Sequence, residues 1–226
     1  MTKLFNRLPV ELIEVDFPSF LDQQNSDKRK HDFVFVRDLF VSNQQGKVII
    51  SKFSEEARQV ESDIMEIMLN SMGYQTTRIP DSINAKAEGG EFYYCSDQKI
   101  LFSGACRNNT KGAEWVAQEF DVNELIIMKS DVFHLDTLFT PVINKNNQLA
   151  AVIACTSLME KESVNNLKSF AKRLSIDLVE VEPEDSIGTD EKLGEFAVNC
   201  CPLPGYLIGP TRFRSLKVNQ ILKEVN

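Results

Sequence analysis

The sequence lacks the features that define several protein classes. Its 226 residues include two histidines and five cysteines, and no two cysteines have the Cys-x-x-Cys spacing of a zinc ligand set. We therefore expect neither a metal site nor a disulfide framework. The longest uninterrupted apolar run covers residues 149–155, far short of a membrane span, and the first seven residues contain no apolar leader. These absences favour a cytoplasmic protein that does not enter a membrane.

An excess of positive charge is also missing. The 33 acidic residues outnumber the 25 basic ones, so the formal net charge is −8 and the pI is about 4.9. Such a chain is poorly suited to nucleic acid phosphates, whereas it suits a small cationic ligand. Hydrophobic residues make up 42% and charged residues 26%, a balance typical of globular proteins. The length is sufficient for one sizeable core or two small ones, and we expect a single domain over residues 1–226.

The sequence does contain a weak internal repeat. Each unit has a polar opening, a hairpin with a polar turn, an amphipathic helix and an exit strand. The openings lie at residues 37–38, 88–91, 134–136 and 196–199. Three hairpins are predicted at 39–51, 92–103 and 137–154, with helices at 54–72, 111–120 and 163–174 and exit strands at 75–79, 124–128 and 177–181. A fourth hairpin around 202–205 precedes a last helix at 215–225.

No single unit of this kind can bury its own apolar face, so we expect the units to pack around a common axis. This packing brings all openings to one end of the assembly. The polar residues gathered there are Arg37, Asp38, Glu88, Glu91, His134, Asp136 and Asn199. In the first helix we expect Ser54 as the N-cap and Ile67 on the buried face.

Each opening has a structural and a functional interpretation. Asp32 and Asp38 flank a short apolar stretch and either end a buried strand or hold a cation such as a guanidinium. Residues 88–91, Glu-Gly-Gly-Glu, form either a plain turn or a place where the backbone approaches a ligand closely. His134 and Asp136 would share one face of a strand, where the histidine is either structural or a general acid/base.

The cysteines are interpreted as small buried residues. Cys200 and Cys201 lie in the predicted fourth hairpin. Cys95, Cys106 and Cys155 have the surroundings of core or near-core positions.

Five short stretches together resemble the guanidine-modifying superfamily of pentein folds, which includes dimethylarginine dimethylaminohydrolase, arginine deiminase and glycine amidinotransferase. The stretches are Phe-Val-Arg-Asp at 35–38, Glu-Gly-Gly-Glu at 88–91, Arg-Asn-Asn at 107–109 with Gly112, His-Leu-Asp at 134–136, and Ala-Val-Asn at 197–199. They occur in the family's order. The resemblance runs from about Asp32 to the end of the chain, and it implies an α/β-propeller of five units, of which four are recognisable, in a domain incomplete at both ends.

The resemblance also implies roles. His134 would be the general acid/base and Glu88 its partner, while Asp38 and Asp136, with Asp32 as a weaker candidate, would bind a guanidinium and Arg107 a substrate carboxylate. The reaction would hydrolyse a guanidinium C–N bond of arginine or a methylated arginine to citrulline through a thiouronium intermediate, without metal or cofactor. The nucleophilic cysteine of the family has no counterpart here, because Cys200 and Cys201 align with the Ala-Asn element.

Two alternatives stay open. An amidinotransferase would pass the amidino group to a second amine, and a binding protein would keep the guanidino pocket without turnover. A homo-oligomer is compatible with either.

Overall fold

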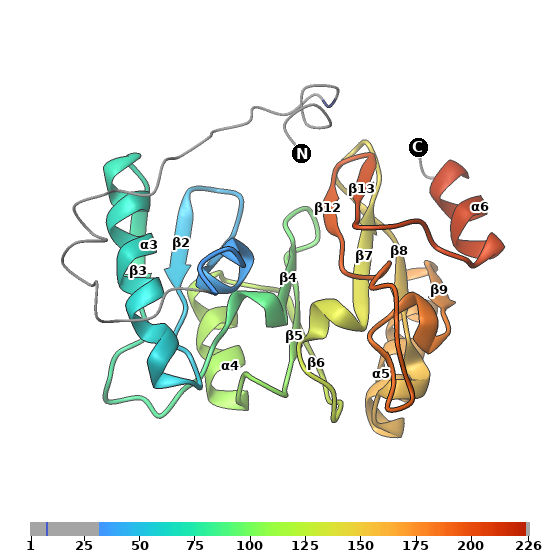
Figure 1. Ribbon diagram of the computed structural model, residues 1–226. Coiled ribbons are helices and arrows are strands. Elements are labelled where there is room, and N and C mark those ends of the chain that lie inside the picture. The colour runs from blue at the N-terminus through green and yellow to red at the C-terminus, as the bar shows by residue number, and fades with distance from the viewer. Residues whose placement is uncertain (1–7, 9–31, 225–226) are drawn as a thin grey trace.

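The computed structural model describes residues 8 and 32–224 and contains a mixed α/β fold (Figure 1). The N-terminal segment, His31 and the last two residues, which the sequence analysis also considered, lie outside the described residues. Within the described part, none of the helices combines the length and the apolar character needed to cross a bilayer.

Three sheets have the same internal order, and they follow one another across the view in Figure 1. In each sheet the first two strands form an antiparallel hairpin, and the third lies parallel to the second. The strands of the first sheet are β1 (Phe40–Ser42), β2 (Lys47–Ile50) and β3 (Gln75–Arg78). Those of the second are β4 (Phe92–Cys95), β5 (Ile100–Gly104) and β6 (Glu124–Met128). Those of the third are β7 (Phe139–Ile143), β8 (Leu149–Ala154) and β9 (Asp177–Glu180).

A helix connects the hairpin to the parallel strand in every sheet, as the handedness and spacing of parallel pairing require. These helices are α3 (Gln59–Ser71), α4 (Thr110–Glu119) and α5 (Lys161–Leu174). The remaining elements are the hairpin β12 (Cys201–Leu203) and β13 (Tyr206–Ile208), the helix α6 (Leu216–Glu224) and a small hairpin, β10 (Gly188–Thr189) with β11 (Lys192–Leu193). The sequence analysis predicted all of these elements except β10 and β11.

The first helix differs from its prediction. A 3-10 turn at Glu56–Arg58 precedes α3, and Ser54 is not an N-cap, because its backbone N–H and its hydroxyl both donate to Glu88 Oε1. Ile67, expected in the core, is 46% exposed. By contrast, Asn109 caps α4 by accepting from the Gly112 N–H at 2.9 Å.

A short 3-10 turn precedes the first strand of each sheet. The turns are Val36–Leu39 before β1, Gly89–Glu91 before β4 and Leu135–Thr137 before β7. They coincide with the first three predicted openings, although β7 begins two residues later than predicted because Leu135–Thr137 is not extended. Three further 3-10 turns lie at Glu56–Arg58, Thr156–Leu158 and Pro183–Asp185.

The largest apolar cluster joins the second and third sheets with the C-terminal segment. Phe102 lies at its centre, with ring centroids 4.8 Å from Phe139 and 5.4 Å from Phe170. Smaller clusters lie between the first two sheets and under α3. The burial of this apolar surface fixes the three openings relative to one another.

Candidate active site

The three 3-10 turns bring a histidine and four carboxylates into one buried cluster. The side chains of the cluster are Asp38, Glu88, Glu91, His134 and Asp136, and none of the five residues is more than 6% exposed. We call these five residues the charged cluster. Buried charges of this kind are tolerated only when each is paired or hydrogen-bonded, so their partners define the site.

His134 lies between two carboxylates. Its Nε2 is 3.3 Å from Glu88 Oε2, and its Nδ1 is 3.7 Å from Asp38 Oδ1. Burial lowers the pKa of the imidazole, but the Glu88 hydrogen bond and the charges of Asp38 and Asp136 outweigh burial and raise the pKa above its usual value. The arrangement therefore favours the protonated imidazolium.

Glu88 is the most fully satisfied carboxylate of the site. Oε1 accepts from the Ser54 N–H at 2.9 Å and the Ser54 hydroxyl at 2.6 Å, while Oε2 faces His134. The Asn108 side chain accepts from the Glu88 N–H at 2.7 Å. Burial opposes ionisation, but the bonds from His134 and Ser54 and the charge of Arg107 hold the Glu88 pKa at about 2. Glu88 is thus held in its ionised form next to His134.

Gly89 and Gly90 occupy positions where no side chain larger than hydrogen fits. A Cβ built on Gly89 would lie 2.0 Å from the carbonyl oxygen of Arg37. A Cβ on Gly90 would lie 2.5 Å from Asp38 Oδ1, 2.9 Å from His134 Nδ1 and 3.5 Å from an oxygen of Asp136. The Glu-Gly-Gly-Glu motif is therefore a turn whose backbone closely approaches other groups of the chain, and its approach to a ligand stays a prediction.

The same distances show that His134 and Asp136 both reach Gly90. The predicted reason was wrong, because Leu135–Thr137 is a 3-10 turn and not a strand with alternating faces. The predicted proximity of Asp38, His134 and Asp136 is nevertheless present.

Asp38 already holds a guanidinium that belongs to the chain itself. The Arg58 Nη1 donates to Asp38 Oδ2 at 3.0 Å, and the Arg58 Nε donates to Glu61 at 3.1 Å. Asp32 also contacts Arg58: its carbonyl oxygen is 3.4 Å from Nη2 and its carboxylate is 3.9 Å from Nε. Oδ2 of Asp38 is therefore paired with Arg58, whereas Oδ1 faces His134 Nδ1. Binding of a ligand cation by Asp32 and Asp38 stays a prediction.

Asp136 is placed beside Arg37. The Nε of Arg37 is 3.6 Å from Asp136 Oδ2, and the Arg37 guanidinium donates to the carbonyls of Phe92 and Cys200 at 3.0 and 3.1 Å. Burial raises the pKa of Asp136, while the positive charges of Arg37 and His134 oppose this rise. Cys200, the residue after the fourth opening, thus contacts the arginine beside Asp136 through its carbonyl.

Arg107 lies at the edge of the cluster. Its Nη2 pairs with Glu55, its Nε is 3.6 Å from Glu88 Oε2, and its guanidinium carbon lies 4.8 Å from the centroid of the Phe133 ring. The Arg107 Nε is buried but has no hydrogen-bond partner. The side chain is 20% exposed, so it can be reached from solvent.

Glu91 connects two openings. Its Oε1 accepts from the Arg107 N–H at 2.6 Å and its Oε2 from the Leu135 N–H at 3.0 Å. Burial raises the pKa of Glu91 in spite of these bonds. The residue was recognised as part of an opening but received no role, because its partners are backbone groups that no side-chain pattern reveals.

None of the five cysteines, all of which are described, has the low pKa of a reactive thiolate. Burial raises the pKa of Cys95 and Cys200 to about 12 and also raises that of the other three. Cys95, Cys155 and Cys200 are buried as predicted, but Cys106 and Cys201 are exposed, contrary to prediction. Cys200 also precedes β12, so it is not within a strand.

Several residues of the site were not predicted. Arg58 was missed although Arg58 and Glu61 have the i, i+3 spacing of a helical ion pair, which was a usable signal. Phe133, Glu55 and Ser54 were missed because only the tertiary arrangement brings them to Arg107 and Glu88. Within the described residues, no group of three or more His, Cys, Asp or Glu side chains is arranged to hold a metal ion.

Solved structures share this fold at low sequence identity. Apo ArgZ, an arginine dihydrolase from the ornithine–ammonia cycle in cyanobacteria, is 18% identical with a TM-score of 0.68, over 89% of this chain and 32% of ArgZ. The product-bound N-terminal domain of ArgZ is 17% identical with a TM-score of 0.67, over 99% of this chain and 72% of the domain. DDAH from Pseudomonas aeruginosa, complexed with citrulline, is 18% identical with a TM-score of 0.62, over 86% of this chain and 67% of DDAH.

The chain therefore spans about a third of the length of full ArgZ. Among curated proteins, no sequence matches the chain. A family model described as N,N dimethylarginine dimethylhydrolase, eukaryotic, matches residues 9–190, which is most of the chain. With the fold and the charged cluster described above, this match shows that the chain belongs to the N,N dimethylarginine dimethylhydrolase family.

Proposed function

We propose that this protein acts on the guanidinium C–N bond of arginine or a methylated arginine and forms citrulline. The observation that carries the proposal is the convergence of Asp38, His134 and Asp136 on Gly90. Carboxylate oxygens in a buried site match the N–H donors of a planar guanidinium, and they favour its cationic form. Membership of the dimethylarginine dimethylhydrolase family supports the same substrate class.

In this proposal Asp136 and Oδ1 of Asp38 bind the guanidinium, and Arg107 binds the carboxylate of the substrate. Asp32 contributes indirectly, because it lies on Arg58, which holds Oδ2 of Asp38. The carboxylates orient the guanidinium carbon towards the attacking group. Such orientation lowers the entropic part of the barrier before any bond is broken.

His134 is the general acid/base and Glu88 its partner. The Glu88 anion favours an imidazolium, which can donate its proton to the leaving amine after a thiolate has added to the guanidinium carbon. None of the five cysteines of the sequence provides this thiolate in the structure, so the step requires a nucleophile other than the cysteines as they are placed here. The neutral imidazole then removes a proton from the water that attacks the thiouronium carbon. Cleavage of the C–S bond regenerates the thiolate and leaves a protonated ureido product, whose proton passes to the released amine. The net reaction converts a guanidinium and water into a ureido group and an ammonium ion, and both the imidazolium and the thiolate are restored.

We extend the proposal to the architecture. The three sheets of equal strand order and the β12–β13 hairpin represent four of the five units of an α/β-propeller, within one catalytic domain over residues 1–226. The meeting of three openings in one buried cluster supports this arrangement.

A second candidate function is binding of a guanidino compound without turnover. The observation in its favour is the raised thiol pKa at all five cysteines, because the hydrolytic reaction requires a thiolate. This candidate uses the same carboxylates and the same arginine, so it makes the same predictions for binding.

A turnover assay separates the candidates. The protein is incubated with L-arginine and with Nω,Nω-dimethylarginine, and citrulline and the released amine are quantified with and without glycine as an acceptor. Citrulline that disappears in His134→Ala supports the hydrolase. Guanidinoacetate formed only with glycine would indicate an amidinotransferase, and saturable binding without product would favour the binding function.

A further inference from the structure

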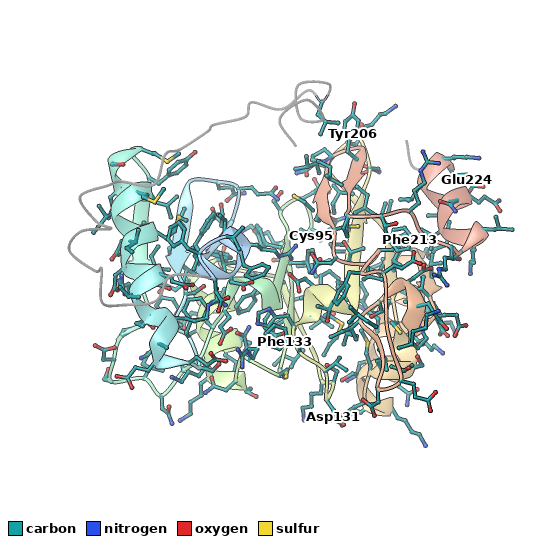
Figure 2. The ribbon with its side chains drawn as sticks, viewed as in Figure 1. Cys95, Asp131, Phe133, Tyr206, Phe213 and Glu224 are labelled. Carbon is teal, nitrogen blue, oxygen red and sulfur yellow. The ribbon has the colours of Figure 1, made fainter. Side chains whose placement is uncertain are left out.

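Phe133 has an unusual position for an aromatic residue. It lies on the loop between β6 and β7, directly before His134, and it is 49% exposed although its neighbour is buried. Figure 2 shows Phe133 below the centre of the view, with Asp131 further out on the same loop. An exposed phenylalanine alone needs no explanation. The contacts of this ring do.

The Phe133 ring packs against two cationic groups. The imidazole of His134 stacks on it with a centroid distance of 4.2 Å and an interplanar angle of 25°, and the guanidinium carbon of Arg107 lies 4.8 Å from its centroid. Both distances are within the range of an attractive interaction between a cation and an aromatic face. The ring therefore stabilises positive charge on both neighbours.

The carboxylate of Glu88 is adjacent to the same two groups. Its Oε2 is 3.3 Å from His134 Nε2 and 3.6 Å from Arg107 Nε. Phe133 and Glu88 thus each contact both cationic groups, so the four side chains form a closed ring of interactions. The other contacts of the Arg107 guanidinium are an ion pair with the exposed carboxylate of Glu55 and the 3.6 Å approach of its Nε to Glu88 Oε2.

We propose that Phe133 is a positioning residue of this site, whose ring holds the imidazole of His134 and the guanidinium of Arg107 on the carboxylate of Glu88. The consequence for turnover rests on the proposed function, whereas the positioning itself does not. The aromatic face is the essential property, because a branched aliphatic side chain would fill similar space without attracting either cation.

The pKa of His134, measured by titration, tests this role directly. The charged groups that face His134 are Glu88, Asp38, Asp136, Glu91 and, across Phe133, Arg107. None of these charged groups is removed when only Phe133 is changed. Loss of the aromatic face removes an interaction that favours the imidazolium, so Phe133→Leu should lower the His134 pKa by about half a pH unit. Phe133→Tyr keeps the ring and should leave the titration unchanged.

The experiment is a proton NMR titration of the histidine Cε1–H signals. The chain has two histidines, so the His31→Gln variant assigns both signals. Tyr74→Leu is the matched control, because Tyr74 is 40% exposed and lies beyond the end of α3. In the same samples, the exchange of the Arg107 Nε–H with solvent should accelerate in Phe133→Leu and not in Phe133→Tyr.

Equal His134 titration in the wild type and Phe133→Leu would overturn the proposal, as would an equal shift in Phe133→Tyr and Phe133→Leu. Phe133→Met repeats the comparison if the leucine variant does not fold. The measurement requires neither substrate nor turnover. Failure of the proposed function would therefore leave the titration result intact, and a negative titration would leave the proposed function standing.

Discussion

The two ends of the same hairpins differ sharply in chemistry. At the opening end, Asp38, Glu88 and Asp136 are buried beside arginines. At the turn end, neutral side chains join the three hairpins, with Gln44 accepting from the Ser96 hydroxyl at 3.0 Å and Ser96 accepting from Asn147 at 2.9 Å.

The two ends differ in the cost of leaving their polar groups without hydrogen-bond or ionic partners. A buried carboxylate is costly without a partner, so each one at the opening end has a cation or several hydrogen-bond donors. The side chains at the turn end are more exposed, so their hydrogen bonds can be replaced by hydrogen bonds to water at little cost in free energy. Such a difference is expected if selection at the opening end acts on chemistry and selection at the turn end acts on chain reversal. The predictions below run from the largest expected effect to the smallest.

Glu88→Gln should have the largest effect. The pKa of Glu88 is about 2 in the folded protein and about 4.3 in an unfolded chain, so ionisation of Glu88 contributes about 3 kcal/mol to stability above pH 5. Because this pKa is depressed, the contribution is lost as the pH falls from about 4.5 towards 2. Urea unfolding as a function of pH should therefore show a flatter acid limb in the variant. Glu114→Gln, an exposed change on α4, is the control, and an acid limb as steep in Glu88→Gln as in the wild type would contradict the assignment.

Gly90→Ala should follow, with a loss of about 2 kcal/mol from overpacking against Asp38 and His134. Gly46, at the turn end, has open space around it but a φ of +92°. Its replacement by alanine should cost about 1 kcal/mol through backbone strain, and asparagine should be milder there. At Gly90 asparagine should be worse than alanine. The same rank order at both glycines in thermal unfolding would contradict the steric explanation.

His134→Asn should cost about 1 kcal/mol at pH 6 and less at pH 9. The His134 pKa is raised by folding, so its contribution is complete below about pH 6.5 and is lost as the pH rises through the folded pKa. Chemical unfolding of both proteins at the two pH values measures the difference. A wider gap at pH 9 than at pH 6 would show that the folded pKa is lowered instead.

Gln44→Ala should have the smallest effect, below about 0.5 kcal/mol, because its bond to Ser96 is exposed. Turnover or ligand binding should be unchanged. A loss comparable with that of Glu88→Gln in urea unfolding would remove the contrast between the two ends.

The sequence predicts the elements well where local signals are strong. The strand at 124–128 and the helices α4 and α5 lie within two residues of their predicted bounds. The openings were harder, because a 3-10 turn and a strand end have the same polar composition. Consequently the proximity of His134 and Asp136 was predicted from a geometry that is not present.

The carboxylates and the histidine of the candidate site were predictable from the sequence, whereas Arg58 and the aromatic partner of Arg107 were not. Asp38, Glu88, His134 and Asp136 belong to short motifs that keep their order along the chain. Arg58 lies 20 residues from Asp38, and Phe133 meets Arg107 only through the loop before β7. No local pattern specifies these tertiary contacts, so the pairing of Asp38, Glu88 and Asp136 with arginines emerged only from the structure.

Calorimetric titration of the full chain with L-arginine and with L-lysine tests the central claim most directly. Both ligands have an α-amino group, an α-carboxylate and a cationic side chain, but only arginine has a planar guanidinium. The account predicts saturable one-to-one binding of arginine, at least tenfold weaker binding of lysine, and loss of this preference in Asp136→Asn. No detectable arginine binding, or equal binding of both ligands, would contradict it.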